Sequence, residues 1–538
     1  MCGIWAAIKR SGSKLTPEVI HALVSALLSR GPEYMAVQDV SGTPATLGFT
    51  RLAINGLTPA GHQPFSHDGI HIVCNGEIYN YKELAARWSI DLPSGTSDCA
   101  VLPHLLRKLP LKEVCKALDG VFAFVAVDTR FQKVYVARDP YGVRPLFTAQ
   151  STDGVFFASE MKGLPANCTI IEAFQPGTCA SYRLNGDLLE VQTHHTIPTV
   201  KVPLFEDRLA AQAALRIALE SAVKKRLLSD RPIGSLLSGG LDSSLIAALA
   251  AKELAAQGKK LNTFSIGMPG STDLYYARKV ADHIGSNHHE ILVKPEDFLA
   301  AIPAVIDAAE TYDITSVRAS VGNYLVGKYI KENTDIKVVF NGDGSDEVGG
   351  GYLYFFAAPS DEEFEAESER LLKEIHVYDV LRSDRGMAAH GLEARTPFLD
   401  KAFVATWRAL PTRFRRPVKG SQVEKQILRE AFEGSGLLPH EVLWRKKEAF
   451  SDGVSSTADS WYLRCANYAK TLDKSLADIR EETAALHNPP QTEEAYWYRM
   501  LFQKIYGEQA ARVIPAMWMP RWIAGAQDPS ARTLKELY

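Results

Sequence analysis

The stretch PIGSLLSGGLDSSLIAALAAKELAAQ, residues 232–257, decides the fold of the second half of the chain. Its apolar start, PIGSLL, predicts a buried strand, and the alanine-rich run SLIAALAAKELAAQ at 244–257 predicts a helix. Between them lies SGGLDSS, a glycine pair bounded by hydroxyl side chains. At the start of a helix, such a loop lets backbone N–H groups and the helix dipole approach a polyanion. We therefore expect a phosphate cradle here, with an ordinary strand-to-helix turn capped by serine as the alternative.

The loop residues expected to contact such an anion carry either a hydroxyl group or no side chain. A carboxylate among them would add an oxygen ligand for a magnesium ion, which prefers oxygen donors. The predicted cradle consists of Ser238, Gly239, Gly240, Asp242, Ser243 and Ser244.

The segments that follow alternate between strand and helix patterns. The run 273–285 reads as a helix, whereas strands are predicted for NTFSIGM at 262–268, HHEILV at 288–293 and VVFNG at 338–342. This alternation is typical of a doubly wound parallel sheet, in which ligands collect beyond the carboxyl ends of the strands. SGGLDSS and NGDGSDEVGGGY, residues 341–352, both fall at such a position. The three carboxylates in NGDGSDE therefore favour a magnesium-nucleotide site over a solvated loop.

One motif is misleading. GNYLVGKY, residues 322–329, has the spacing of a Walker A loop up to its lysine, but Tyr329 replaces the required Ser or Thr. It also lies inside a predicted helix and follows no strand. We interpret it as structural.

In the first half of the chain, Cys2 follows Met1 directly and precedes Gly3. Removal of Met1 would leave a residue with both a free thiol and a free α-amine. The amine could accept the thiol proton, so that the thiolate attacks a carboxamide and ammonia is released. The alternative is that Cys2 is only a small buried apolar residue.

Three further segments supply groups that such an amidase needs. Arg51, in FTRLAI, is suited to an amino-acid carboxylate, and Asp98, in GTSDC, could accept an α-ammonium group. In NGEIYN at 75–80, the side-chain amide of Asn75 and the N–H of Gly76 could both point at a tetrahedral oxyanion. Taken singly, each could be solvated surface or a turn.

Together with MCGIW, SRGPE at 29–33 and RDPYGVRPLF at 138–147, these segments resemble the glutaminase domain of glutamine-dependent amidotransferases with an N-terminal cysteine nucleophile. The resemblance covers about residues 1–185. It implies a four-layer α/β/β/α sandwich in which Arg51 and Asp98 grip glutamine, Glu77 lies beside them, and Asn75 with Gly76 forms the oxyanion hole. FTRLAI and SRGPE depart mildly from the usual RLSI and RHRGPD of the family.

SGGLDSS resembles the pyrophosphate-binding loop of the ATP pyrophosphatase superfamily. With ETYDITSVRAS at 310–320, GLEARTPFLD at 391–400 and RKKEAFSDG at 445–453, the region from about 205 to 455 resembles the synthetase domain of asparagine synthetases. The whole chain is thus similar to glutamine-hydrolysing asparagine synthetases of the B type. The fold class this implies is α/β, a sandwich followed by a doubly wound parallel sheet with extra C-terminal helices.

The resemblance also implies roles for single residues of the second half. Leu236 and Ile266 would border adenine, Asn341 and Gly342 would contact the nucleotide, Asp242 and Asp346 would hold magnesium, Lys447 would neutralise the pyrophosphate, and Asp343 would assist attack by ammonia. Asn341 departs from the usual Ser, which matters only if that hydroxyl contributes to binding ATP. Arg318 and Arg395 could contact phosphates or carboxylates, or form salt bridges at the edge of the core.

The activity implied is synthesis of asparagine from aspartate, with ATP and Mg²⁺, through β-aspartyl-AMP and with ammonia taken from glutamine. A dry passage across the domain interface would carry the ammonia. One alternative keeps the fold but adenylates another carboxylate. A second, non-catalytic alternative is an assembly or regulatory protein, for which the motifs should be eroded.

Composition bounds the remaining expectations. The 538 residues support two or three domains, with 46% hydrophobic and 23% charged residues and a net charge of −3. We expect small-molecule substrates, no nucleic-acid or membrane partner, and a homodimer. The seven cysteines show no metal-ligand spacing, and no leader precedes Cys2, so we expect a reducing, cytoplasmic location and an unglycosylated Asn167.

The proline-marked stretch THHTIPTVKVPLF is the expected linker. It divides the chain into a glutaminase domain at 2–192, a linker at 193–205 and a synthetase domain at 206–538. Residues 455–538 have a mainly helical pattern, and we expect them to pack against the synthetase domain.

Overall fold

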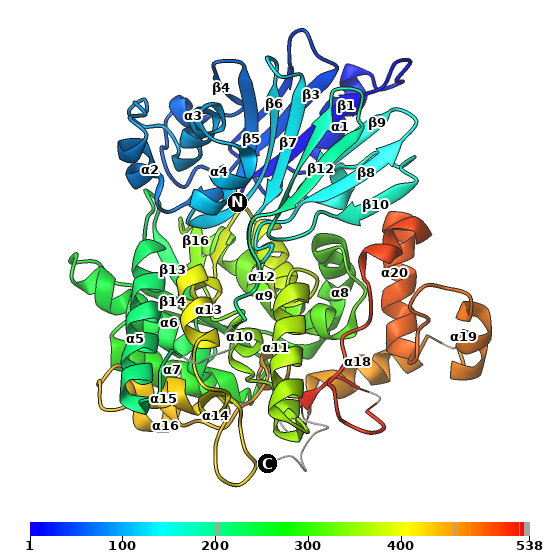
Figure 1. Ribbon diagram of the computed structural model, residues 1–538. Helices are drawn as coiled ribbons and strands as arrows, with labels where there is room; N and C mark the ends of the chain where they lie inside the picture. The colour runs from blue at the N-terminus through cyan, green and yellow to red at the C-terminus, as the bar shows by residue number, and fades with distance from the viewer. Residues whose placement is uncertain (200–203, 457–458, 473, 527, 532–538) are drawn as a thin grey trace.

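The computed structural model describes residues 1–199, 204–456, 459–472, 474–526 and 528–531. Two sheets form its upper half, a third sheet wrapped by helices forms its lower half, and the N-terminus lies where the halves meet (Figure 1). Residues 200–203 of the expected linker lie outside the described residues.

The upper half contains two antiparallel six-stranded sheets. The first has the order β10-β8-β9-β1-β3-β2, with β10 (Ile170–Ala173), β8 (Phe147–Ser151), β9 (Gly154–Ala158), β1 (Gly3–Lys9), β3 (Ala45–Arg51) and β2 (Tyr34–Asp39). The second has the order β12-β11-β7-β6-β5-β4, with β12 (Leu188–Thr193), β11 (Thr178–Arg183), β7 (Lys133–Arg138), β6 (Gly120–Asp128), β5 (Ile70–Ile78) and β4 (Phe65–His67).

Alternating apolar residues explain why these sheets stack. Successive side chains of a strand point to opposite faces. In β1, Ile4 and Ile8 join the core between the sheets, whereas Trp5 packs with α1 (Pro17–Ser25) on the outer face. In β5, Val73 faces the first sheet and Ile72 packs under α2 (Tyr81–Arg87), α3 (Val101–Lys108) and α4 (Leu111–Ala117). The predicted four-layer α/β/β/α sandwich is confirmed.

The lower half contains the predicted parallel sheet. Its order is β15-β14-β13-β16-β17, with β15 (Asn287–Leu292), β14 (Asn262–Gly267), β13 (Ile233–Leu236), β16 (Val338–Phe340) and β17 (Glu393–Arg395). Val338 and Phe340 share one core with α5 (Arg208–Lys225), α6 (Leu241–Ala255), α7 (Thr272–Ile284) and α13 (Lys401–Arg408). Val339 shares the other with α8 (Pro295–Ala309) and α9 (Ile314–Asn333). Because neighbouring residues of one strand enter different cores, the sheet is covered on both faces.

Two differences from the expected boundaries bear on the site. The helix after SGGLDSS begins at Leu241 rather than Ser244, so the last four residues of the loop form the first helical turn. The strand at 338 ends at Phe340, since Asn341 and Gly342 already belong to the loop that follows. GNYLVGKY lies within α9, as expected from its pattern.

The remaining helices surround the lower half and extend along its side (Figure 1). They are α10 (Ser345–Gly349), α11 (Asp361–Glu374), α12 (Asp379–Ala388), α14 (Thr412–Arg415), α15 (Gln426–Phe432), α16 (His440–Leu443), α17 (Phe450–Gly453), α18 (Trp461–Lys470), α19 (Leu476–Thr483) and α20 (Glu493–Ala510). In the part of the chain that the structure describes, no helix has the length and apolar character needed to cross a membrane.

Candidate active sites

The first candidate site lies at the start of β1. The Cys2 backbone N–H donates to Asn75 Oδ1 at 3.1 Å, and the Cys2 thiol lies 3.7 Å from the Leu52 carbonyl oxygen. The Asn75 side-chain NH₂ group is buried without a hydrogen-bond partner among the described residues. A buried donor without a partner is costly, so this amide is available to a bound anion or carbonyl oxygen.

Met1 changes the chemistry of this site. Its α-amine is buried 4.0 Å from Glu393, and burial lowers the pKa of that amine to about 6. Burial also raises the pKa of the Cys2 thiol to about 11. With Met1 in place, the nitrogen of Cys2 is an amide and cannot act as a base. The predicted pair of thiol and amine on one residue therefore requires removal of Met1.

The other predicted glutaminase residues have protein partners. The Arg51 guanidinium donates to the carbonyl oxygens of Thr58, at 2.9 Å, and Gly56. Asp98 accepts a hydrogen bond from the Ile78 N–H at 2.6 Å, and its burial raises the pKa of the carboxyl. These bonds to neighbouring backbone fix the orientation of both side chains.

Glu77 lies at the junction of the two halves. It accepts from the Asn55 amide at 2.5 Å and lies 3.2 Å from Arg395 Nη2. Burial first, and then the nearby charge of Glu393, raise the pKa of the Glu77 carboxyl well above its usual range. Sequence reasoning placed Glu77 only beside the glutamine grip, but its charged partner comes from GLEARTPFLD of the second half.

Further buried ion pairs cross the same junction. Arg144, in RDPYGVRPLF, lies 3.2 Å from Glu393, and Arg30 lies 2.8 Å from Asp384. Arg395 also donates to Glu393 at 2.9 Å and to the carbonyl oxygens of Arg226 and Leu228. For Arg395, the structure therefore favours the salt-bridge interpretation.

Arg318 is also engaged in salt bridges. Its guanidinium donates to both carboxylate oxygens of Glu494, at 2.8 and 2.6 Å, and to both of Asp528, at 2.9 and 2.8 Å. The side chain is only 4% exposed. Four charge-assisted hydrogen bonds satisfy a buried guanidinium that would otherwise be costly.

The second candidate site is a pocket beyond the carboxyl ends of β13, β14 and β16. Most of the side chains predicted for ATP and magnesium line it, namely Leu236, Ser238, Gly240, Asp242, Ser243, Ile266, Asn341, Gly342, Asp343, Asp346 and Lys447. SGGLDSS and NGDGSDE thus meet, as their positions after strands predicted.

Two predicted loop residues support the pocket rather than line it. Gly239 has φ of +74°, and a Cβ there would approach the backbone nitrogen of Ala277 to 2.4 Å. Only glycine fits this close, left-handed position. Ser244 is buried in α6, where its N–H donates to the Gly240 carbonyl oxygen at 3.1 Å.

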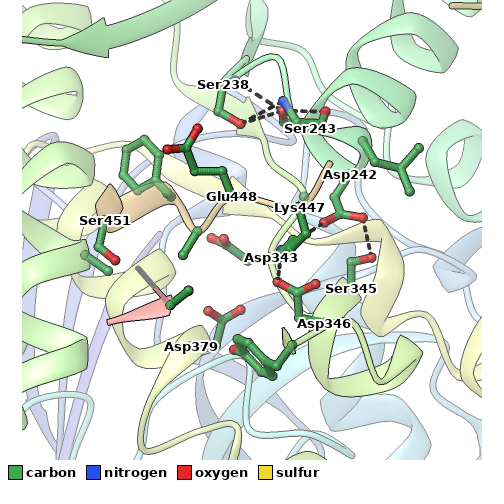
Figure 2. A pocket seen from close by; sticks show the side chains of 18 of the residues that line it. Ser238, Asp242, Ser243, Asp343, Ser345, Asp346, Asp379, Lys447, Glu448 and Ser451 are labelled. Atoms are coloured by element: carbon green, nitrogen blue, oxygen red, sulfur yellow. Dashed lines mark hydrogen bonds and ion pairs between the residues drawn. The ribbon is translucent and has the colours of Figure 1, made fainter. Parts of the chain in front are cut away.

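Opposite charges gather at one end of the pocket. Lys425 Nζ donates to both oxygens of Asp242, at 2.7 and 2.6 Å, and to Asp346 at 2.7 Å. Lys447 Nζ lies 2.5 Å from the other oxygen of Asp346, and Ser345 donates to Asp242 at 2.7 Å (Figure 2). Despite burial, the two lysines hold the pKa of Asp346 far below its usual range. Asp346 is therefore ionised, and the carboxylate oxygens of Asp242 and Asp346 are of the type that a divalent cation prefers.

Several residues of this pocket escaped sequence reasoning. Lys425 belongs to no motif, yet its φ of +52° is rare for a residue with a side chain, which indicates that the surrounding structure imposes its position. Arg382 lies 3.1 Å from Asp343, and the Glu347 carboxylate is buried with one oxygen lacking a hydrogen-bond partner among the described residues. Glu347 stands in NGDGSDE, so that motif was the one available signal.

Asn341, the departure from the usual Ser, has a well-defined role in the loop. Its amide donates to Asp343 Oδ2 at 2.8 Å and to the Ser383 hydroxyl at 2.6 Å. The side chain thus helps to orient Asp343, which faces the pocket.

The fold and both sites define a glutamine amidotransferase domain that is joined to a second domain of a nucleotide-binding type. In agreement, a sequence profile described as a glutamine amidotransferase domain matches residues 1–199. A profile described as asparagine synthase matches residues 214–366 and 357–524.

Curated relatives match the whole chain. The glutamine-hydrolysing asparagine synthetase of Gallus gallus is 44% identical over 566 residues, covering 99% of both chains. That of Homo sapiens is 44% identical over 565 residues, covering 99% of this chain and 98% of the relative. The chain therefore belongs to the family of glutamine-hydrolysing asparagine synthetases.

Proposed function

We propose that this enzyme synthesises asparagine from aspartate and ATP, with glutamine as the nitrogen donor. The observation that carries the proposal is the 44% identity across nearly the full length of both chains, together with the pocket in which SGGLDSS, NGDGSDE and Lys447 meet. One reaction with glutamine, aspartate, ATP and Mg²⁺ tests it. Asparagine, glutamate, AMP and pyrophosphate should form in equal amounts. Pyrophosphate release with glutamate, but none with aspartate, would contradict aspartate as the acceptor of the nitrogen.

In the synthetase pocket, a β-carboxylate oxygen of aspartate attacks the α-phosphorus of ATP. Pyrophosphate leaves with the bonding electron pair, and β-aspartyl-AMP remains. Leu236 and Ile266 border the adenine, and the loop around Ser238 and Gly240 holds the phosphates at the start of α6. This assignment is supported by their common place in the pocket lining and by the affinity of helix N-termini for phosphate.

Asp242 and Asp346 are the proposed ligands of Mg²⁺. No group of three or more His, Cys, Asp or Glu forms a metal site within the described residues. Two carboxylates fit Mg²⁺ nevertheless, because this ion usually binds one or two carboxylates and completes its shell with phosphates and water. When bound, it would neutralise charge on the pyrophosphate. Lys447 and Lys425, released from the acids, would add positive charge on the same side.

Ammonia completes the reaction by attacking the acyl carbon of β-aspartyl-AMP. The bond from that carbon to the phosphate oxygen breaks, AMP leaves with its electron pair, and the attacking nitrogen loses a proton. Asp343 is the proposed acceptor of that proton. Its bonds to Asn341 and Arg382 support the role, because they fix the carboxylate at the pocket wall.

Cys2, freed of Met1, is the proposed nucleophile of the glutaminase site. Its thiolate attacks the glutamine carboxamide, ammonia leaves, and water then hydrolyses the thioester to glutamate. The unpartnered Asn75 amide supports an oxyanion hole shared with the Gly76 N–H. Arg51 and Asp98 would grip the α-carboxylate and the α-ammonium group. Intact mass measurement should show that glutamine-consuming protein lacks the methionine. Active protein that retains Met1 would contradict this mechanism.

We also propose that ammonia crosses between the sites without entering bulk water. Water would protonate ammonia and hydrolyse the acyl-adenylate. The buried ion pairs of the junction support a closed interface, since they place opposite charges next to each other away from water. During glutamine-dependent turnover, labelled free ammonium should enter asparagine only slightly. Full equilibration of the label with the product nitrogen would refute the passage.

The domain division at 2–192, 193–205 and 206–538, a homodimer and a cytoplasmic location remain our proposals. Strand β12 ends at Thr193, and the match to the amidotransferase profile ends at residue 199. Both ends support the division. Limited proteolysis should cut first in the linker. Light scattering should give twice the mass of one chain.

A further inference from the structure

The C-terminal stretch, residues 515–526 and 528–531, lies against the synthetase pocket. Sequence reasoning gave this region no role beyond packing. Four of its residues line the pocket, namely Trp518, Pro520, Pro529 and Ala531. The pocket that holds the acid and lysine cluster is therefore completed by the end of the chain.

Helix α9 holds this stretch from one side. Asp313, which caps α9 through Ser316, also accepts a hydrogen bond from the Trp518 N–H at 2.7 Å. Arg318, one turn further along, binds both carboxylate oxygens of Asp528. ETYDITSVRAS thus binds the C-terminal stretch at two points, one before and one after residue 527, which lies outside the described residues.

The segment that carries Lys447 holds the stretch from the other side. The Ser530 hydroxyl donates to Asp452 Oδ1 at 2.7 Å. Asp452 is buried in α17, and its neighbours Phe450 and Ser451 line the pocket. Ser530 is only 6% exposed. The C-terminal stretch therefore bridges α9 and RKKEAFSDG across the pocket.

Trp518 provides an aromatic wall at the acidic end. It is 8% exposed and packs against Tyr352, with ring centroids 5.3 Å apart, and against Tyr354 at 6.0 Å. The Tyr352 hydroxyl donates to Glu347, which also lines the pocket. The indole thus adds apolar area to the pocket wall beside the tyrosine that binds Glu347.

We propose that the C-terminal stretch is a functional wall of the synthetase site, and that Trp518 is a positioning residue that keeps water away from β-aspartyl-AMP. The inference rests on the proposed function. Two nucleophiles compete for the same acyl carbon. With ammonia, AMP leaves and asparagine forms. With water, the same carbon–oxygen bond breaks, AMP leaves, and aspartate is regenerated at the expense of one ATP. Exclusion of water therefore sets the ratio of pyrophosphate to asparagine.

Trp518→Ala opens this wall, and Trp522→Ala is its matched control. Trp522 belongs to the same stretch and packs against Tyr354 and Phe355, with centroids 5.9 and 6.0 Å apart, but it does not line the pocket. With saturating ammonium and no glutamine, the ratio of pyrophosphate to asparagine should rise about threefold or more in Trp518→Ala and stay at the wild-type value in Trp522→Ala.

Ser530→Ala provides a milder test, because it removes one hydrogen bond and leaves Trp518 intact. In Ser530→Ala, the ratio of pyrophosphate to asparagine should rise less than in Trp518→Ala. Its glutaminase activity should equal that of the wild type. A wild-type ratio in both Trp518→Ala and Ser530→Ala would overturn the inference. If the wild-type enzyme itself made no asparagine and no pyrophosphate from aspartate, the proposed function would fail instead.

Discussion

The two candidate sites differ in what holds their side chains before a substrate binds. In the glutaminase site, Arg51 is held by backbone groups 5 and 7 residues away, and Asp98 by one 20 residues away, all in the first half of the chain. In the synthetase site, the acids Asp242 and Asp346 are held by the ammonium of Lys425, which lies 183 and 79 residues away. The side chains of the first site are thus held by backbone over short and medium separations, and those of the second by a side chain that only the tertiary fold brings close.

This difference indicates what must change in each site before it can work. The glutaminase site needs a covalent change, because Met1 keeps the Cys2 nitrogen in an amide, which cannot accept the thiol proton. The proposed synthetase site needs an exchange of partners, because the ATP phosphates and the proposed Mg²⁺ would replace the contacts that Lys425 and the two acids now make with each other. A substitution in one site should therefore leave the other largely intact.

Cys2→Ala gives the largest expected effect and tests that independence. Without the thiol no thioester can form, so glutamine-dependent synthesis should fall by about 10⁴-fold or more. Ammonia-dependent synthesis should persist, since the synthetase site is unchanged. The two activities are measured as asparagine formation, once with glutamine and once with ammonium as the nitrogen source. Cys168→Ala, a buried cysteine elsewhere in the same half, is the control and should keep both activities. Loss of both activities in Cys2→Ala would show that the sites are not independent.

Asp346→Asn should produce the converse pattern. The change removes one proposed ligand of Mg²⁺ and breaks the ion pair of 2.5 Å between Asp346 and Lys447. Pyrophosphate formation should fall by about 10²-fold or more, because charge on the leaving group is no longer neutralised. Glutaminase activity should persist to some degree. Asp297→Asn, an exposed acid on α8, is the matched control. Unchanged synthesis in Asp346→Asn would remove this residue from the metal site.

Contiguous motifs made the fold and much of both sites predictable. Residues 232–257 contain the strand, the SGGLDSS loop and the helix in one stretch. An offset of three residues in the predicted helix start therefore does not move the loop. NGDGSDE is similarly local. Where the chemistry depends on backbone close to the residue itself, sequence patterns carry the signal.

Residues that act through distant contacts were not predictable. Lys425 stands in a segment without a motif, and only the fold brings it between Asp242 and Asp346. Trp518 lies in the region for which the sequence predicted only packing, and nothing in its spacing connects it with the nucleotide loop. The partner of Glu77 was likewise hidden, because the pairing with Arg395 exists only when the two halves are packed together.

Arg395→Met tests how strongly the junction joins the halves. It removes the guanidinium between Glu77 and Glu393, so that buried Glu77 loses its charged partner while Glu393 keeps Arg144. The free energy of unfolding should fall by about 3–5 kcal/mol, as is typical when one partner of a buried ion pair is lost. Urea denaturation followed by fluorescence measures it. Arg413→Met is the control, because Arg413 pairs with Glu206 on the surface and should matter far less. Equal losses in the two variants would mean that the junction is not a stabilising contact.

Asn341→Ser, which restores the residue usual in the family, should have the smallest effect. Serine keeps the backbone groups of the loop but is too short to replace the amide bonds to Asp343 and Ser383. If the amide only orients Asp343, about 1 kcal/mol of hydrogen-bond energy is lost, and kcat/KM for ammonia should fall about fivefold. The KM for ATP should stay within about twofold, because the nucleotide contacts come from backbone and from SGGLDSS. Asn341→Asp keeps the size of the side chain but places a second carboxylate against Asp343, and it should impair ammonia use more than serine does. A large change in the KM for ATP, with kcat/KM for ammonia unchanged, would instead assign Asn341 to nucleotide binding and separate it from the acid that it now orients.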